Sequence, residues 1–215
     1  MSIKVLLVDD HQIIREGLRV MLEKEYDIII VGEAEDGRMA ERLARELVPD
    51  VIVMDVAMPD LNGIEATRQI TAKVDGVKII ALSMHDDRRF VLNMLKAGAA
   101  GYILKDDAFK SLSKAIRMVM NNKSYYSNQI AEMVDGNSVA PSPGVQSTHK
   151  EVLSSREREV LQLVAEGNTS NQIAEKLFIS TKTVETHRQQ VMVKLHIKNV
   201  AELTKYAVRE GLTML

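Results

Sequence analysis

The sequence of 215 residues predicts a doubly wound parallel α/β sheet followed by a smaller domain made only of helices. Three observations support this prediction. Five short apolar runs alternate with amphipathic stretches over roughly the first half of the chain. The segment DGNSVAPSPGVQSTHK (135–150) is rich in Ser, Pro and Gly and has no periodicity, which is typical of a flexible linker. After this segment, residues 153–215 show helical spacing but no strand pattern.

Each apolar run of the first part is short enough for a strand, and a candidate helix follows each one. The predicted strands are Ile3–Val8, Ile28–Val31, Val51–Met54, Val77–Leu82 and Tyr102–Leu104. The predicted helices are Gln12–Lys24, Arg38–Leu47, Gly63–Ala72, Arg88–Lys96 and Ala108–Asn121, with a further short one at Ser127–Val134. Continuous apolar strands fit burial on both faces, so we expect a flavodoxin-like (βα)5 sheet with strand order 2-1-3-4-5.

Four helices are predicted after the linker, each beginning near a capping residue. Glu157–Glu166 follows Ser154-Ser155, and a second helix runs from a cap at Asn168 or Thr169 through Leu177. The third, Thr183–Leu195, has Ser180 or Thr181 as its cap, and the fourth, Val200–Arg209, stops before Gly211. A short turn joins the second and third helices, which is the outline of a helix-turn-helix.

Composition excludes some classes of protein. The chain has no cysteine, which excludes disulfides and thiolate metal sites. No apolar run approaches the ~18 residues of a membrane span, and the first apolar stretch is too short for a signal peptide, so we expect a cytoplasmic protein without membrane contact. Residues 150–215 carry 10 basic and 8 acidic side chains, and the remainder carries 18 and 22. That asymmetry alone is weak support for nucleic-acid binding.

Five polar residues lie at or just after the ends of predicted strands: Asp9, Asp10, Asp55, Ser83 and Lys105. The carboxyl ends of parallel strands share one edge of a sheet, where ligands bind. Three carboxylates, a hydroxyl and an ammonium at one place can hold a divalent cation and a phosphoryl group.

The sequence resembles the two-component response regulators of the NarL/FixJ (LuxR-type helix-turn-helix) family over nearly its whole length. In the first part the resemblance rests on VLLVDDHQIIREGL (5–18), VIVMDVAMPDLNGIEA (51–66), ALSMHD (81–86) and AGAAGYILKD (97–106). In the second it rests on LSSREREVLQLVAEGNTSNQIAEKLFISTKTVETH (153–187) and KLHIKNVAELTKYAVREGL (194–212). It implies a receiver domain at 1–123, a helix and flexible linker at 124–151, and a helix-turn-helix DNA-binding domain at 152–215.

The resemblance also implies roles for the polar cluster. Asp55 matches the phosphoacceptor, and Mg²⁺, with Mn²⁺ as an alternative, would be bound by Asp10, Asp55 and the carbonyl of Ala57, and through a water by Asp9. Lys105 and Ser83 would contact the phosphoryl group, and Tyr102 matches an aromatic switch position. We further hypothesise that His85 and Ala57 tune the lifetime of the aspartyl phosphate.

In the second part, the resemblance places the recognition helix at Thr183–Leu195. The matching DNA-contacting residues are Lys182, Thr183, Glu185, Thr186, His187, Arg188 and Gln189. Glu185 departs from members that carry lysine there, which puts any borrowed operator sequence in doubt. The last helix resembles the surface through which the family dimerises, with Val200, Leu203, Thr204 and Val208 as its contact residues; core packing is the alternative interpretation.

We therefore expect a transcription factor that a sensor histidine kinase phosphorylates and that binds promoter double-stranded DNA with inverted half-sites as a homodimer, with RNA polymerase as a further partner. Its only expected enzymatic reactions are its own phosphorylation and dephosphorylation. Two other functions remain open: a Mg²⁺-dependent phosphohydrolase, which usually has a second Asp where this chain has Ala57, and a dimerisation scaffold whose DNA binding ignores phosphate.

Overall fold

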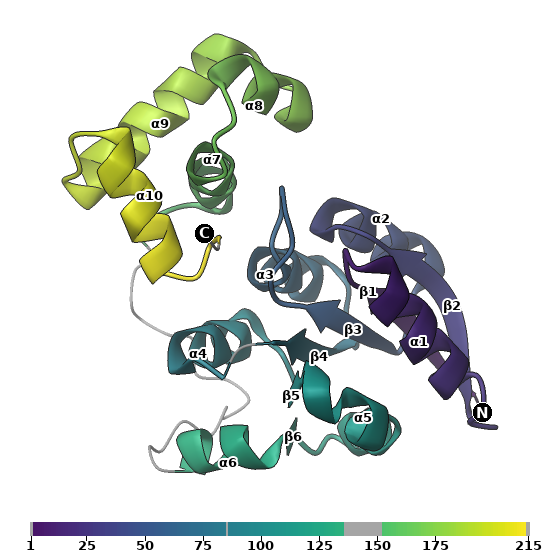
Figure 1. The fold of residues 1–215 in the computed structure, drawn as a ribbon. Helices are drawn as coiled ribbons and strands as arrows, with labels where there is room; N and C mark the ends of the chain where they lie inside the picture. The colour runs from purple at the N-terminus through teal and green to yellow at the C-terminus, as the bar shows by residue number, and fades with distance from the viewer. Residues whose placement is uncertain (1, 85, 136–151, 214–215) are drawn as a thin grey trace. The chain divides into compact units, whose positions relative to one another are not determined.

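The computed structural model describes residues 2–84, 86–135 and 152–213, which form two compact units (Figure 1). His85 and nearly all of the predicted linker lie outside the described residues. Within the described ranges, no helix is long and apolar enough to cross a membrane.

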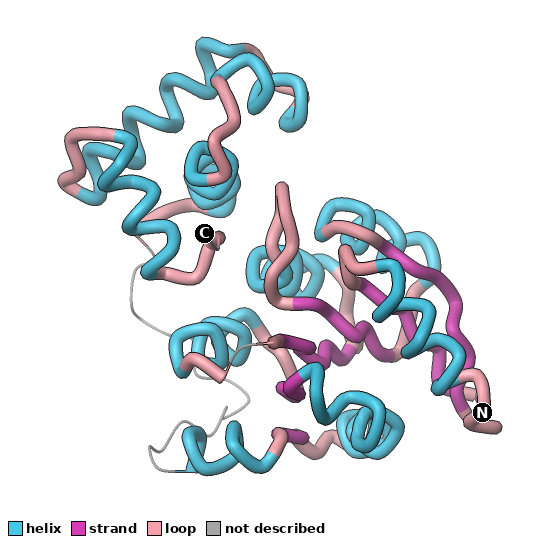
Figure 2. Tube along the Cα trace, in the orientation of Figure 1, coloured by secondary structure: helices cyan, strands magenta, loops and turns pink. Residues whose placement is uncertain are grey.

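The first unit is a parallel sheet with strand order β2-β1-β3-β4-β5-β6, drawn in magenta in Figure 2. The strands are β1 (Ile3–Val8), β2 (Ile28–Ala34), β3 (Val51–Asp55), β4 (Lys78–Ser83), β5 (Gly101–Leu104) and β6 (Tyr125–Tyr126). The predicted order 2-1-3-4-5 is confirmed, and β6 extends it by one short strand. The central strand β3 is buried along its whole length, as expected for a strand covered on both faces.

Helices cover both faces of this sheet (Figure 1). Helices α1 (Gln12–Leu22) and α5 (Lys105–Met120) contact each other on one face. Helix α3 (Gly63–Lys73) contacts α2 (Gly37–Leu47) and α4 (Arg88–Ala97) on the other. Side chains alternate between the two faces along each strand. Val5, Leu7 and Val53 therefore lie on the face covered by α1 and α5, where they pack with Leu18 of α1 and Leu112 of α5.

Strand β6 was not predicted, because a two-residue strand leaves no periodic signal. Tyr125 pairs with Gly101 of β5, where a Cβ atom would lie 2.8 Å from the Tyr125 carbonyl oxygen. The absence of a side chain at Gly101 therefore permits this approach. The Ser127 hydroxyl accepts a hydrogen bond from the Leu104 N–H at 3.0 Å, and helix α6 (Asn128–Asp135) follows. Residues 125–135 thus pack on the first unit.

The second unit contains four helices, as predicted: α7 (Ser155–Ala165), α8 (Ser170–Leu177), α9 (Thr181–Leu195) and α10 (Val200–Arg209). Ser154 and Thr169 cap α7 and α8, each in a reciprocal capping box, and Ser180 caps α9. The unit closes a core of its own, whose central members include Val160, Leu163, Ile173, Val184, Val191 and Leu203.

Candidate functional site

The polar residues at the strand ends come together at one edge of the sheet. Parallel pairing sets Val8 beside Met54, Asp55 beside Leu82, and Ser83 beside Leu104. Residues that directly follow these strands therefore emerge side by side, which places Asp9, Asp10 and Lys105 around Asp55. The sheet register thus explains why residues distant in the sequence share one site.

Lys105 contacts two of the three acids. Its Nζ lies 2.7 Å from Asp55 Oδ2 and 2.7 Å from Asp9 Oδ2. The side chains of Lys105, Asp55 and Asp9 are only 6%, 3% and 2% exposed. Lys105 is also the first residue of α5, which begins three residues earlier than predicted. The helix start therefore fixes where the buried ammonium group emerges.

Burial perturbs the titration of Asp55. Its pKa is raised to about 6, chiefly because burial disfavours the charged form and because Asp9 repels it, while Lys105 and the Ala57 N–H act in the opposite direction. The Ala57 N–H donates to Asp55 Oδ1 at 3.2 Å. At Gly63 a Cβ atom would lie 1.9 Å from the Asp55 carbonyl oxygen, so only glycine lets α3 begin this close to the acid.

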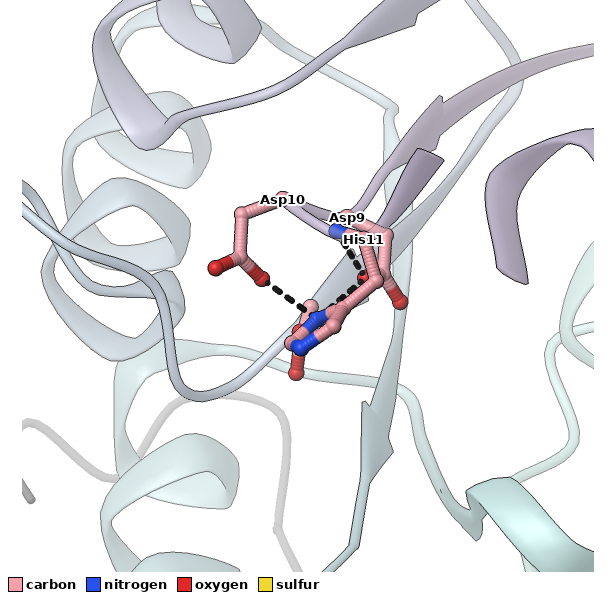
Figure 3. Close-up of side chains that lie close together, drawn as sticks. Asp9, Asp10 and His11 are labelled. Carbon is pink, nitrogen blue, oxygen red and sulfur yellow. Dashed lines mark hydrogen bonds and ion pairs between the residues drawn. The ribbon is translucent and has the colours of Figure 1, made fainter. Parts of the chain in front are cut away.

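Asp10 and His11 form the exposed side of the cluster (Figure 3). His11 Nδ1 lies 2.9 Å from Asp10 Oδ1 and 3.3 Å from Asp9 Oδ1, and the His11 N–H donates to Asp9 Oδ1 at 2.9 Å. Ligand atoms of Asp9, Asp10, His11 and Asp55 all lie within 4.8 Å of one another, so this cluster can bind a metal ion. His11 is not among the predicted site residues, although its position directly after the two acids is a usable signal.

Ser83 and Tyr102 connect the cluster to the interior of the sheet. Ser83 is buried at the end of β4, and its side chain shares a hydrogen bond with the Tyr102 hydroxyl. Tyr102 is fully buried, and burial raises its pKa to about 12. The predicted switch residue is thus linked to the pocket through a serine hydroxyl.

In the second unit, α9 carries the predicted DNA-contacting residues. Lys182, Thr186 and Gln189 are exposed, whereas Thr183, Glu185, His187 and Arg188 are half-buried. Thr183 is engaged in the helix cap, since its N–H donates to the Ser180 hydroxyl at 3.1 Å. Both Glu185 oxygens have partners, namely Ser170 of α8 and Arg188 of α9. The seven residues therefore differ in how freely they can reach a ligand.

The four predicted dimerisation residues on α10 also divide into two kinds. Leu203 is 1% exposed and belongs to the core of the second unit, where α10 contacts α7. Val200 is 46% exposed, and Thr204 and Val208 are half-buried. The alternative interpretation, core packing, thus describes Leu203, while the other three offer surface to a partner.

Comparison with known proteins assigns each of the two units to a protein family. Residues 5–117 match the family model of the response regulator receiver domain, and residues 151–207 match that of the bacterial regulatory proteins of the luxR family. The transcriptional regulatory protein LiaR of Bacillus subtilis (strain 168) is 40% identical over 210 residues, which cover 98% of this chain and 99% of LiaR.

Solved structures of the response regulator RcsB are also similar. An RcsB–DNA complex has 27% identity and a TM-score of 0.61, and covers 98% of this chain and 99% of RcsB. A structure of two RcsB dimers bound to two parallel DNAs has 28% identity, a TM-score of 0.60 and the same coverage. The chain therefore belongs to the LuxR-family response regulators, transcription regulators that combine a receiver domain with a helix-turn-helix DNA-binding domain.

Proposed function

We propose that a sensor histidine kinase phosphorylates this response regulator on Asp55, with Mg²⁺ bound beside it, and that the phosphorylated protein binds promoter DNA as a homodimer in the cytoplasm. The observation that best supports this proposal is the position of Lys105 Nζ, 2.7 Å from both Asp9 and Asp55. One ammonium group among three carboxylates leaves an excess of negative charge. A divalent cation with a preference for oxygen ligands would neutralise that excess.

The donor set fits Mg²⁺, and also Mn²⁺, because it offers hard carboxylate oxygens. Asp10 and Asp55 would be direct ligands with the Ala57 carbonyl, and Asp9 would hold a metal-bound water. The bound cation would neutralise charge that develops on the phosphoryl oxygens. No second acid stands at position 57, where phosphohydrolases of the alternative class usually have one, so we favour the response-regulator function.

In the proposed reaction an Asp55 carboxylate oxygen attacks the phosphorus of a phosphohistidine, the P–N bond breaks, and the histidine leaves. The phosphoryl group carries close to two negative charges in place of the single charge of the Asp55 carboxylate, so the pocket gains about one negative charge. Lys105 is already within ion-pair distance of Asp55 and would compensate part of that charge. A phosphoryl oxygen would also compete with Tyr102 for the Ser83 hydroxyl. Loss of the bond between Ser83 and Tyr102 would release Tyr102 and so transmit the modification away from the pocket.

The division of the chain follows from the same proposal. Residues 1–123 form the receiver, 124–151 a helix and linker, and 152–215 the DNA-binding domain. Helix α9 would enter the major groove, where Gln189 can pair with adenine and Lys182 with guanine or phosphate. Surface residues of α10 would form the dimer contact, so the operator would consist of two inverted half-sites. RNA polymerase is a further proposed partner.

Acetyl phosphate labelling tests the proposal. In Mg²⁺ the wild-type chain should take up one phosphoryl group, Asp55→Asn should take up none, and EDTA should abolish labelling. Asp75→Asn, at an exposed position of the first unit, is the matched control and should behave as wild type. Labelling that persists in Asp55→Asn would place the acceptor elsewhere.

DNA binding provides the second test. Phosphorylation should raise the affinity of the wild type for promoter DNA, and the affinity should fall steeply with salt. Equal binding before and after phosphorylation would favour the scaffold function. Turnover of a phosphorylated small molecule beyond one equivalent would favour the phosphohydrolase.

A further inference from the structure

We infer that Glu185 is a positioning residue that holds Arg188 of α9, and α8 through Ser170, in the arrangement that meets DNA, and that it does not read a base itself. This inference rests on the proposed DNA binding by α9. It differs from the direct DNA contact that the family resemblance implies for Glu185.

The two carboxylate oxygens of Glu185 have different partners. The Ser170 hydroxyl donates to Oε1, and Arg188 Nη2 lies 2.6 Å from Oε2. The side chains of Glu185 and Arg188 are 44% and 36% exposed. Each oxygen could accept one further hydrogen bond, but a rotation of the Glu185 side chain toward a cytosine amino group would break these contacts. A carboxylate with both oxygens engaged is therefore better suited to hold its neighbours than to read DNA.

The contact with Ser170 joins the two helices of the helix-turn-helix. Ser170 is the first residue of α8, directly after the Thr169 cap. A second polar link lies nearby, because the Thr181 hydroxyl donates to the Asn171 side-chain oxygen at 3.1 Å. Both links join the beginning of α8 to the N-terminal part of α9. In helix-turn-helix proteins the N-terminal residues of the second helix contact base edges. These links therefore fix the part of α9 whose orientation matters most for recognition.

The ion pair with Glu185 restricts the orientation of the Arg188 side chain. An arginine whose guanidinium group is already held loses less side-chain freedom when it contacts DNA. Arginine contacts guanine or phosphate through a planar fork of donors, so its orientation decides which of these it can reach. Both side chains keep more than a third of their surface exposed, and such an ion pair, three residues apart in a helix, adds little to stability. Loss of Glu185 should therefore change DNA discrimination rather than folding.

The test compares binding profiles of full-length variants. Duplexes selected by the phosphorylated wild type from a randomised pool define its preferred site. Affinities for every single-base-pair variant of that site, together with the slope of log affinity against log salt, are then measured for Glu185→Ala, Glu185→Gln, Ser170→Ala, Arg188→Ala and Arg188→Lys. Gln190→Ala, at an exposed position on the same helix outside the predicted DNA-contacting residues, is the control for loss of a side chain.

We expect Glu185→Ala and Ser170→Ala to weaken discrimination by about 3- to 10-fold, less than the roughly 10- to 100-fold of a lost arginine contact. The loss should fall at the base pairs, or in the salt slope, that Arg188→Ala changes. Glu185→Gln should recover part of the loss, because its amide oxygen can still accept from Ser170. The double variant Glu185→Ala/Arg188→Ala should be weaker than Arg188→Ala by no more than Ser170→Ala is weaker than the wild type. All variants should unfold at the wild-type temperature.

Two results would overturn the inference. Glu185→Ala could relax a base pair that both Ser170→Ala and the Arg188 variants leave intact, which would show that Glu185 reads that base. Alternatively, Glu185→Ala and Ser170→Ala could both keep the wild-type profile. Failure of the wild type to bind or enrich any duplex is a different result, because it would reject the proposed DNA binding itself.

Discussion

The ammonium group of Lys105 lies 2.7 Å from Asp55 Oδ2 and belongs to a residue that begins a helix. The same group lies 2.7 Å from Asp9 Oδ2, so one buried cation stands against two buried acids. Removal of the cation and removal of one acid should therefore have opposite effects on the stability of the receiver in the absence of metal.

Lys105→Ala should destabilise the metal-free receiver by about 3 kcal/mol, because loss of one partner leaves buried carboxylates uncompensated. Urea unfolding in EDTA measures this change. Lys110→Ala, at an exposed position of the same helix, is the control and should change the free energy of unfolding by less than about 0.5 kcal/mol. Equal stability of the two variants would mean that the ion pair contributes nothing.

Asp55→Asn should stabilise the metal-free receiver at pH 7.5 by about 1–2 kcal/mol. The pKa of Asp55 is raised to about 6, so its ionised form is disfavoured in the folded chain relative to the unfolded one. Protonated Asp55 makes its full contribution to the free energy of unfolding below about pH 4. This contribution is lost as pH rises through 6. Unfolding of the wild type in EDTA should show this loss between pH 4 and 7, and Asp55→Asn should reduce it.

Addition of Mg²⁺ should also distinguish the wild type from Asp55→Asn in thermal unfolding. Mg²⁺ should raise the unfolding temperature of the wild type, because a cation at the proposed site would bind only the folded form and would neutralise the acids. It should have a much smaller effect on Asp55→Asn, which lacks one proposed ligand. A variant that Mg²⁺ stabilises as much as the wild type would argue against Asp55 as a ligand.

The acid cluster could be predicted because it depends on a simple rule. Residues that follow parallel strands emerge at one edge, so Asp9, Asp55 and Lys105 were placed together by strand order alone. The contact between Ser170 and Glu185 could not be predicted in this way, since it depends on how two helices cross. The same holds for Leu203, whose spacing suits either a core or a surface, and for β6, which forms because Gly101 lets Tyr125 approach.

Tyr102→Phe tests the proposed route out of the pocket. The substitution keeps the buried ring but removes the hydroxyl that is bonded to Ser83. Uptake of phosphate from acetyl phosphate should stay within about twofold of wild type, because the substitution leaves Asp55, Lys105 and the proposed metal ligands in place. The increase in DNA affinity on phosphorylation should fall severalfold in mobility-shift titrations. A normal increase would mean that the signal leaves the pocket by another route.

Substitution of a buried residue of α10 should affect stability, whereas substitution of an exposed one should affect dimer formation on DNA. Leu203→Ala should cost about 2–5 kcal/mol of unfolding free energy, because it opens a cavity in a closed core. Val200→Asp, at an exposed position, should leave stability nearly unchanged and weaken cooperative binding to paired half-sites. Unfolding of the fragment 152–215 and binding to one or two half-sites separate these effects. Unchanged cooperativity in Val200→Asp would remove α10 from the proposed dimer contact.

Acid should unfold the DNA-binding unit partly through Glu157. This side chain is 4% exposed, accepts from the Ser154 N–H at 2.7 Å and lies 2.7 Å from Lys194 Nζ. Burial favours the neutral form, but the bonds from Lys194 and Ser154 outweigh it, so the pKa of Glu157 is lowered from 4.5. The stability that the ionised Glu157 provides is therefore complete above about pH 4.5 and is lost as pH falls through the lower, folded-state pKa.

Glu157→Gln in the fragment 152–215 isolates this contribution. At pH 7 the variant should be about 1–2 kcal/mol less stable than wild type, because it weakens a helix cap and removes an ion pair. Near pH 3 the difference should shrink, since the wild-type carboxylate is then largely protonated. Lys194→Met, which removes only the ion pair, should show a smaller loss with the same trend. A difference between wild type and Glu157→Gln that is constant from pH 7 to 3 would show that charge is not what the cap requires.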